Sequence, residues 1–270
     1  MRGWVFEGQE QLRLYERKRE FLEHLFDELS SCVDLRTALD VGCGIGLFSK
    51  CLSELGLKVT GLDARSKNIA EAKRRYPNIK FIVSDVEDEK VRELGLFDLV
   101  LCFGLMYHLE NPFRAIRNLH ALTRYILIIE SMVSPARSPT AILMSECQGE
   151  DQSLHYVAFV PSEACLIKML YRAGFSEVYK TTELPDYEDF RVSFFHRRRR
   201  TVVVASNIKL RSSLLQWTPE PHLLRPDIWQ TRLGFLVQCV ADFYGSLYSR
   251  IRLRSRIRAI LVKVSRRGQR

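Results

Sequence analysis

Several features that define large protein classes are missing from this sequence of 270 residues. No stretch reaches the roughly 18 consecutive apolar residues of a membrane-spanning helix. Residues 1–11 contain two acidic side chains and lack the apolar core of a signal peptide. The seven cysteines are odd in number and include no Cys-x-x-Cys pair, which argues against a disulfide framework or a zinc site. These absences predict a cytoplasmic protein with reduced thiols and no bound metal.

Acidic residues are absent from the last 21 positions, residues 250–270, which contain nine Lys or Arg. The whole chain has 41 basic and 32 acidic side chains and a net charge of +9, which by itself suggests nucleic acid, anionic membrane or acidic substrates. Subtracting the nine basic residues of the tail leaves 32 basic and 32 acidic groups in residues 1–249. The surplus charge therefore belongs to the tail, and the body is neutral.

Short apolar runs alternate with helix-like segments between residues 37 and 130. Hydrophobic residues make up 46% of the chain, so a sizeable core can form. The expected strands are 38–41, 59–62, 81–83, 99–102 and 126–129, and the expected helices are 47–55, 68–75 and 113–122. This alternation predicts an α/β fold with a mostly parallel, Rossmann-like sheet and helices on both faces.

Other segments flank this core on both sides. An amphipathic helix is expected at residues 9–31, a capped helix at 163–172, and closing strands at 175–179 and 201–205. The long connection after the fifth strand is typical of a lid or binding insertion. The predicted organisation is an N-terminal helical cap (1–35), a ligand-binding domain (36–207) with an insertion at about 131–161, and a basic helical extension (208–270).

The glycine-rich segment at residues 40–46 lacks the third glycine of a dinucleotide-binding loop. It reads Asp-Val-Gly-Cys-Gly-Ile-Gly, and Leu47 stands where Gly-x-Gly-x-x-Gly would require glycine. Glycines here let the backbone turn tightly and approach a ligand, and the next helix offers unpaired N–H groups. Asp40, two positions before the first glycine, suits a ligand with a positive amino group. The three glycines are Gly42, Gly44 and Gly46.

Acidic residues also follow the second and third expected strands. Asp63 lies 17 positions after Gly46, where a carboxylate can accept hydrogen bonds from both hydroxyls of a ribose. Asp85 and the N–H of Val86 could bind an adenine edge. Because parallel strands present their carboxyl ends together, these residues are expected on one rim of the sheet.

With this ordered set of residues, the sequence resembles class I S-adenosylmethionine-dependent methyltransferases over about residues 37–205. The resemblance implies that the three glycines wrap the methionine part of the cofactor, with Asp40 near its ammonium group. It also implies that Asp63 holds the ribose, while Asp85 and Val86 hold the adenine. The alternative is a nucleotide-type fold that binds a different ligand.

The fourth strand opens into a Tyr-His-Leu turn that precedes Asn-Pro and a helix. This segment is similar to bacterial methyltransferases that include the wobble-uridine carboxymethyl-transferring group. In the family, residues from Phe103 onward face both cofactor and substrate. Tyr107 could orient the acceptor or cover the cofactor, and His108 has the ordinary pKa of a general base for a hydroxyl acceptor. Both could instead pack the loop against the next helix.

Further candidate residues lie around this rim. Glu130 ends the fifth strand and is a second candidate catalytic carboxylate. Residues of the insertion could build the acceptor pocket or form a solvated loop, and two side chains of the leading helix could close over the cofactor. The Arg run before the last strand could bind phosphate or discourage edge pairing. These residues are Glu146, Glu150, His155 and Tyr156 in the insertion, Tyr15 and Arg19 in the helix, and His196 to Arg200 in the run.

The basic tail has the apolar spacing of an amphipathic helix, with Leu253, Ile257, Ile260 and Val264 on one side. Its apolar stripe could pack on the domain, lie on an anionic membrane surface, or leave the arginines to contact nucleic acid. A peripheral membrane location is therefore one of the expectations.

Three functions follow from these residues. The leading hypothesis is a methyltransferase that uses S-adenosyl-L-methionine and acts on a hydroxyl of a small molecule or glycan, since the body is charge-neutral. An RNA-modifying enzyme and a non-catalytic binding module are the alternatives. The sequence leaves the acceptor open.

Overall fold

The computed structural model describes residues 8–146, 154, 156–191 and 199–221. Within them, an eight-stranded sheet has the strand order β10-β8-β9-β5-β4-β1-β2-β3. Its parallel part consists of β1 (Thr37–Val41), β2 (Lys58–Asp63), β3 (Lys80–Val83), β4 (Phe97–Phe103) and β5 (Thr123–Met132). The antiparallel part consists of β8 (Glu177–Thr181), β9 (Arg200–Ser206) and β10 (Leu215–Trp217). The predicted α/β sheet is confirmed.

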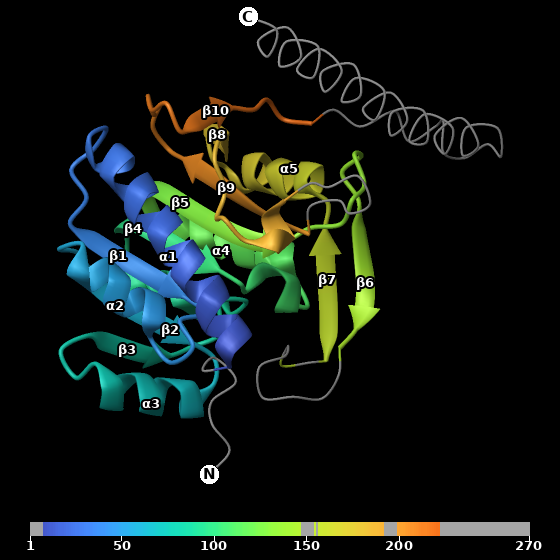
Figure 1. Ribbon diagram of the computed structural model, residues 1–270. Helices are drawn as coiled ribbons and strands as arrows, with labels where there is room; N and C mark the ends of the chain where they lie inside the picture. Colours follow the sequence, from blue (N-terminus) through green and yellow to red (C-terminus); the bar gives the residue numbers. More distant parts are fainter. Residues whose placement is uncertain (1–7, 147–153, 155, 192–198, 222–270) are drawn as a thin grey trace, which may run out of the picture. The chain divides into compact units, whose positions relative to one another are not determined.

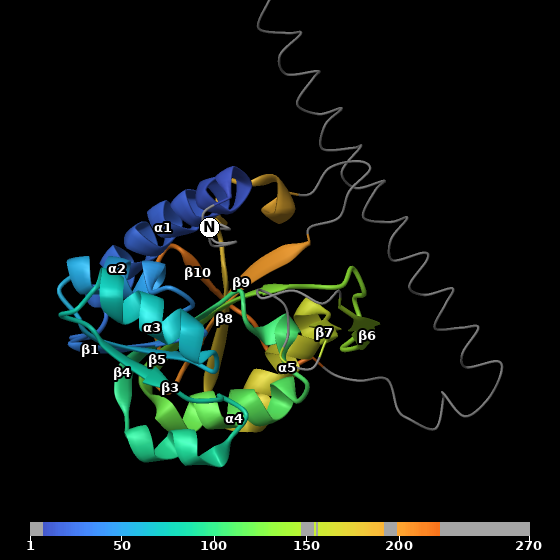
Figure 2. The ribbon, with the colours of Figure 1, turned by 90° about the horizontal axis from the view of Figure 1, so that it is seen from below.

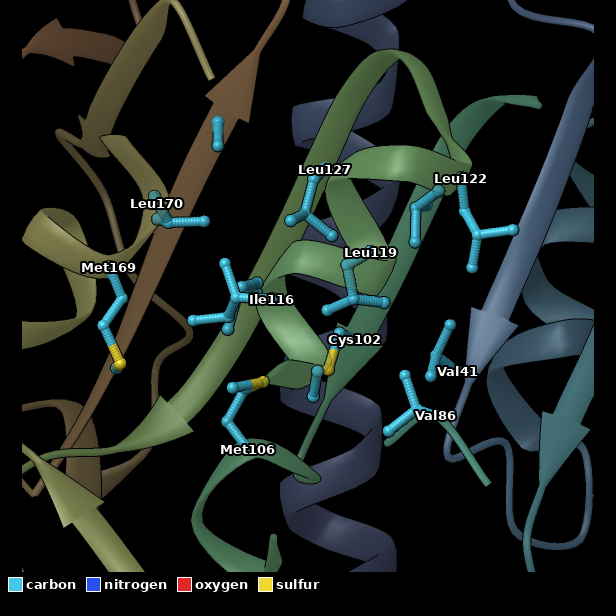
Figure 3. Packing of buried hydrophobic residues seen from close by; sticks show 14 of the residues in the cluster. Val41, Val86, Cys102, Met106, Ile116, Leu119, Leu122, Leu127, Met169 and Leu170 are labelled. Atoms are coloured by element: carbon cyan, nitrogen blue, oxygen red, sulfur yellow. The ribbon is translucent and has the colours of Figure 1, made fainter. Parts of the chain in front are cut away.

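Helices cover both faces of the sheet, as Figures 1 and 2 show. One face carries α1 (Gln9–Ser30) and α2 (Leu47–Glu54), whose apolar side chains pack on alternate strand residues such as Leu99 and Ile128. The other face carries α4 (Pro112–Leu122) and α5 (Glu163–Ala173), packed on the intervening strand residues. Figure 3 shows part of this second core, from Val41 to Leu170. The strands are apolar on both sides because both faces are buried.

The remaining elements complete the βα units. Helix α3 (Ser66–Arg75) packs on β3, and two short 3-10 helices, η2 (Glu89–Leu94) and η3 (Met106–His108), flank β4. A third, η4 (Glu188–Phe190), precedes β9. Helix α5 begins where predicted, because the Ser162 hydroxyl accepts a hydrogen bond from the N–H of Cys165 at 3.0 Å, and it ends at Gly174.

The insertion after the fifth strand is an antiparallel hairpin of β6 (Ala141–Ser145) and β7 (Val157–Pro161). It forms a separate two-stranded sheet at the side of the main one (Figure 1). Its inner side, with Ala158 and Val160, packs against Tyr107 of η3. The insertion therefore lies beside the Tyr-His turn.

The expected domain limits shift in two places. Helix α1 packs directly on the sheet through Leu22, Leu25 and Leu29, so it belongs to the same compact unit as the strands. Residues 208–221 also belong to that unit, because β10 pairs with β8. The predicted basic helix of the tail lies outside the described residues. No helix among the described residues is long and apolar enough to span a membrane.

Candidate cofactor and acceptor site

A cavity of about 490 Å³ lies where the carboxyl ends of the parallel strands meet. This volume is in the range of ligand pockets. Most of the residues expected at the site line it, namely Gly42, Gly44, Asp63, Asp85, Val86, Phe103, Tyr107 and His108. Three of the predicted residues are not part of the lining: Asp40, Gly46 and Glu130. The fold thus brings the two predicted groups, the glycine loop and the Tyr-His turn, to one cavity.

The glycine loop is tied to the neighbouring strand by its backbone. The N–H groups of Gly42 and Cys43 both donate to the carbonyl of Leu62, at 2.7 and 3.0 Å. Gly42 has a φ of +73°, and a Cβ there would lie 3.0 Å from the Leu105 side chain. Gly46, with a φ of +87°, starts α2. Glycine is required at these positions by backbone conformation and by space.

Asp63 organises the loop as well as facing the cavity. Its Oδ2 accepts a hydrogen bond from the N–H of Gly44 at 3.0 Å. Its Oδ1 accepts from the N–H of Arg65 at 2.8 Å and from Asn68 Nδ2 at 3.2 Å. A carboxylate has about four acceptor positions, so about one remains for a ligand. This geometry accommodates one ribose hydroxyl more readily than the two that the sequence suggested.

Aromatic side chains form a wall beside the loop. Phe103 packs edge-on against Phe48 with ring centres 5.1 Å apart, and Phe48 packs on Tyr15 at 4.9 Å. The Tyr15 hydroxyl donates to the carbonyl of Leu47 at 3.1 Å, which fastens α1 to the start of α2. All three rings line the cavity, so α1 closes one side of it, as expected for Tyr15. Arg19 instead forms an exposed pair with Glu23.

Asp40 is buried behind the loop rather than exposed in the cavity. Its Oδ2 accepts a hydrogen bond from the Ser49 hydroxyl at 2.6 Å. Burial raises the pKa of Asp40 to about 7, against the lowering effect of the Ser49 hydrogen bond. The carboxyl group supports the first turn of α2, and its contact with a ligand ammonium stays a prediction.

His108 and Glu146 form a pair in the lining of the cavity. The Nδ1 atom of His108 lies 2.9 and 3.2 Å from the two carboxylate oxygens of Glu146, and both residues line the cavity. Burial lowers the pKa of His108, although the Glu146 carboxylate opposes this effect. His108 is therefore neutral near pH 7, with Nδ1–H donating to Glu146 and Nε2 left as the basic nitrogen.

Glu130 is the centre of a buried ion-pair cluster, not an accessible rim carboxylate. It is 0% exposed, and its two oxygens accept from Lys18 Nζ at 2.7 Å and Arg200 Nη1 at 2.9 Å. Burial favours its neutral form, but the two cations outweigh burial and hold the pKa of Glu130 below its usual value. The buried position of Glu130 therefore argues against a direct catalytic role for this residue.

The cluster also holds Tyr107. Arg200 Nη2 donates to the Tyr107 hydroxyl at 3.2 Å, and the guanidinium lies 5.3 Å from the centre of the ring. The Tyr107 ring in turn lies 4.1 Å from the His108 ring. Glu130 pairs with Val202 across the sheet, so Arg200 lies diagonally from it on the same face. The cluster thus fixes the side chain next to the candidate base.

Two residues of this cluster were not recognised as such in the sequence. Lys18 looked like one more charged residue on an amphipathic helix, and Arg200 was one of four consecutive arginines. Both line the cavity. Lys18 occurs one turn before the buried Phe21 and Leu22, which is the signal that could have placed it on the inner face of α1. Glu150 and His155 lie outside the described residues, and Tyr156 is exposed.

Comparison of the sequence with known proteins identifies a family over its central part. Residues 39–125 match the family described as a methyltransferase domain. A tRNA U34 carboxymethyltransferase of Actinobacillus succinogenes is 29% identical over 150 residues, which cover 53% of this chain and 46% of that protein. A ubiquinone biosynthesis O-methyltransferase of Rickettsia conorii is 35% identical over 102 residues, covering 36% and 35%. The chain thus spans less than half the length of these relatives.

Comparison of the structure with solved structures supports the same fold. The N-terminal domain of EvdMO1, crystallised in the presence of SAH and D-fucose, gives a TM-score of 0.58 at 21% identity, covering 76% of this chain and 90% of that one. Magnesium protoporphyrin IX methyltransferase from Synechocystis PCC 6803 with bound SAM gives 0.51 at 21% identity, covering 77% and 87%. These similarities confirm the predicted Rossmann-like fold.

Proposed function

We propose that this chain, whose residues 39–125 match a methyltransferase domain, is an S-adenosylmethionine-dependent methyltransferase that acts on a hydroxyl group of a small molecule or glycan. The cofactor is the ligand named for solved structures of this fold. When bound, it supplies an electrophilic methyl group on a sulfonium sulfur. The single observation that carries the acceptor proposal is the His108–Glu146 pair, which lines the same cavity as the glycine loop.

The residues present fit this cofactor. The backbone of the glycine loop supports the methionine part, and the remaining acceptor position of Asp63 takes a ribose hydroxyl. Asp85 and Val86 lie at the end of β3, next to the ribose position, and are assigned to the adenine. Asp40 supports the loop from behind through Ser49, and we assign its effect on the ammonium group to this indirect route.

The acceptor side provides a base and a means of holding it. An alcohol is a poor nucleophile until its proton is removed, and the imidazole of His108, whose pKa burial lowers, can accept that proton at Nε2. Glu146 fixes the ring and stabilises the imidazolium that forms. Tyr107, held by Arg200, packs on the ring. Placing the hydroxyl in line with the methyl group supplies much of the remaining rate enhancement.

Two further observations favour a hydroxyl acceptor. Several relatives are named as O-methyltransferases, and one structure of the same fold was crystallised with a sugar present. The neutral charge of residues 1–249 provides no basic field for a nucleic acid. A tRNA-modifying relative keeps RNA as the alternative acceptor.

The test uses the full chain with methyl-labelled S-adenosylmethionine and a fractionated extract of its own cells. We expect wild type to bind the cofactor in a calorimetric titration and to transfer label into a non-RNA fraction. The label should resist mild alkali, because methyl ethers are stable where methyl esters hydrolyse. Absence of cofactor binding, alkali-labile label, or label in ribonuclease-sensitive material would contradict the proposal.

The role of His108 is tested with His108→Ala. General-base catalysis contributes roughly 100- to 10,000-fold, so transfer should fall by about that factor while cofactor affinity changes less than about twofold. His24→Ala, at an exposed position of α1, is the control and should keep full activity. Full activity of His108→Ala would remove this residue from the mechanism.

A further inference from the structure

Exposed apolar side chains are concentrated on the β6–β7 hairpin. Among the described residues, nine large hydrophobic side chains are exposed, and five of them lie in this hairpin and its loop. Leu143 is the most exposed of the nine, at 68%. Scattered apolar residues are normal at a surface, but a group of neighbours marks an interaction site. We call the group the hairpin patch: Ile142, Leu143, Met144, Leu154 and Tyr156.

The patch lies on the outer strand of the hairpin and on the segment that joins its two strands, next to the cavity. The inner strand, β7, packs on Tyr107 through Ala158 and Val160. The outer strand, β6, pairs with β7 alone among the described residues, so its other edge is open (Figure 1). Glu146 and Leu154 at the end of the hairpin line the cavity. A partner that binds the patch therefore also lies beside the cavity.

The apolar residues of β6 are exposed on both faces of the strand. Side chains alternate along a strand, so Ile142 and Met144 lie on one face and Leu143 on the other. A flat protein partner covers one face of a strand, whereas lipid can surround both. Tyr156 adds a ring with a polar tip, the side-chain type enriched where apolar and aqueous phases meet.

Basic residues flank the hairpin patch. Arg137, on the segment leading into β6, is exposed. Arg199 accepts a backbone hydrogen bond from Val133 at 2.7 Å, next to the base of the hairpin, and its side chain is 67% exposed. The described hairpin residues contain one acidic side chain, Glu146, which is paired with His108 and 10% exposed. Glu150 and Asp151 lie in the loop outside the described residues.

We propose that the hairpin patch inserts into the surface of an anionic lipid bilayer, so that the cavity opens at the membrane. Apolar side chains and flanking basic residues are the two contributions that hold a protein at such a surface. Since β6 pairs with no other described strand, the backbone groups on its second edge need water, so the patch enters the headgroup region and not the hydrocarbon core. The membrane contact does not depend on the proposed function. Its consequence for the acceptor, that the hydroxyl group is presented at a membrane, rests on the proposed function.

The test is vesicle flotation of the full chain. The vesicles contain either phosphatidylcholine alone or equal parts of phosphatidylcholine and phosphatidylglycerol. We expect binding to the anionic vesicles, reduced by high salt, and at least tenfold weaker binding of Leu143→Ser combined with Met144→Ser, because two apolar contacts are lost. The control is Leu96→Ser. Leu96 is also an exposed leucine, at 52%, but it lies outside the hairpin, so this variant should bind as wild type.

Three outcomes would overturn the proposal. Wild type could fail to bind either vesicle. The double variant could bind normally while a tail variant, Arg254→Glu with Arg258→Glu, loses binding, which would assign the membrane contact to the tail. Analytical ultracentrifugation could show a dimer that the double variant abolishes while vesicles do not bind, which would make the patch a self-interface. Cofactor titration of each variant checks its folding and separates this proposal from the proposed function.

Discussion

The two sides of the cavity are built in different ways. On the proposed cofactor side, the residues come from one stretch that runs from β1 to Val86 after β3, and backbone N–H groups hold the loop in place. On the acceptor side, charged and aromatic side chains meet from five separate segments. Lys18 and Glu130 are 112 positions apart, and Tyr107 and Arg200 are 93 positions apart.

The two sides of the cavity therefore depend on different interactions: backbone hydrogen bonds on one side and buried ion pairs on the other. The glycine loop is fixed by strand pairing and by the carbonyl of Leu62, so it needs few specific side chains. The acceptor side depends on a buried carboxylate with two buried cations, each of which is costly to leave unpaired. A single substitution should therefore damage the acceptor side more severely, and the two sides should respond differently to pH.

The largest effect is expected from Glu130→Ala. Removing this carboxylate leaves Lys18 and Arg200 buried without their shared partner, which should lower the free energy of unfolding by about 3–5 kcal/mol. Urea denaturation measures the change. Glu54→Ala breaks an exposed pair with Lys50 and should cost less than about 1 kcal/mol. Equal effects of the two variants would show that the buried cluster contributes no special stability.

An intermediate effect is expected on the cofactor side from Asp40→Asn. Because the pKa of Asp40 is about 7 in the folded state and lower when unfolded, its contribution to stability is lost as pH rises towards 7. Over the one and a half pH units from 5.5 to 7, wild type should lose about 2 kcal/mol that the variant keeps. Thermal unfolding at pH 5.5 and 8.5 tests this. Asp34→Asn, at an exposed carboxyl group, should follow wild type, and a parallel response of Asp40→Asn would refute the prediction.

The smallest effect is expected from Glu146→Gln. The carboxylate favours the charged form of His108, so its removal should lower the pKa of His108 further. Titration of the His108 ring signal by NMR measures this without an acceptor. The fraction of neutral base then rises at acidic pH, so any acid limb of activity moves to lower pH. Glu183→Gln, near His24, is the matched control, and an unchanged or raised pKa of His108 would contradict the pairing.

The two sides of the cavity also differ in how well the sequence predicts them, because one is built from neighbouring residues and the other from distant segments. The strands, the glycine loop and Asp63 were predictable because apolar periodicity and glycine spacing are local, and strand order then places the loop at the cavity. Lys18 could not be assigned, because its partner is known only after α1 is placed on β5. Glu130 was predicted as a candidate catalytic carboxylate, but α1 and β9 supply the cations that pair with it in a buried position.

The cavity of this protein is completed by residues from both ends of its folded unit. The two ion-pair partners of Glu130 are Lys18, near the start of this unit, and Arg200, near its end. During synthesis, therefore, the glycine loop and its strands emerge long before the acceptor side can close. The ion-pair cluster around Glu130 is incomplete until β9 has joined the sheet, so the cavity takes its final form only when this late strand is in place.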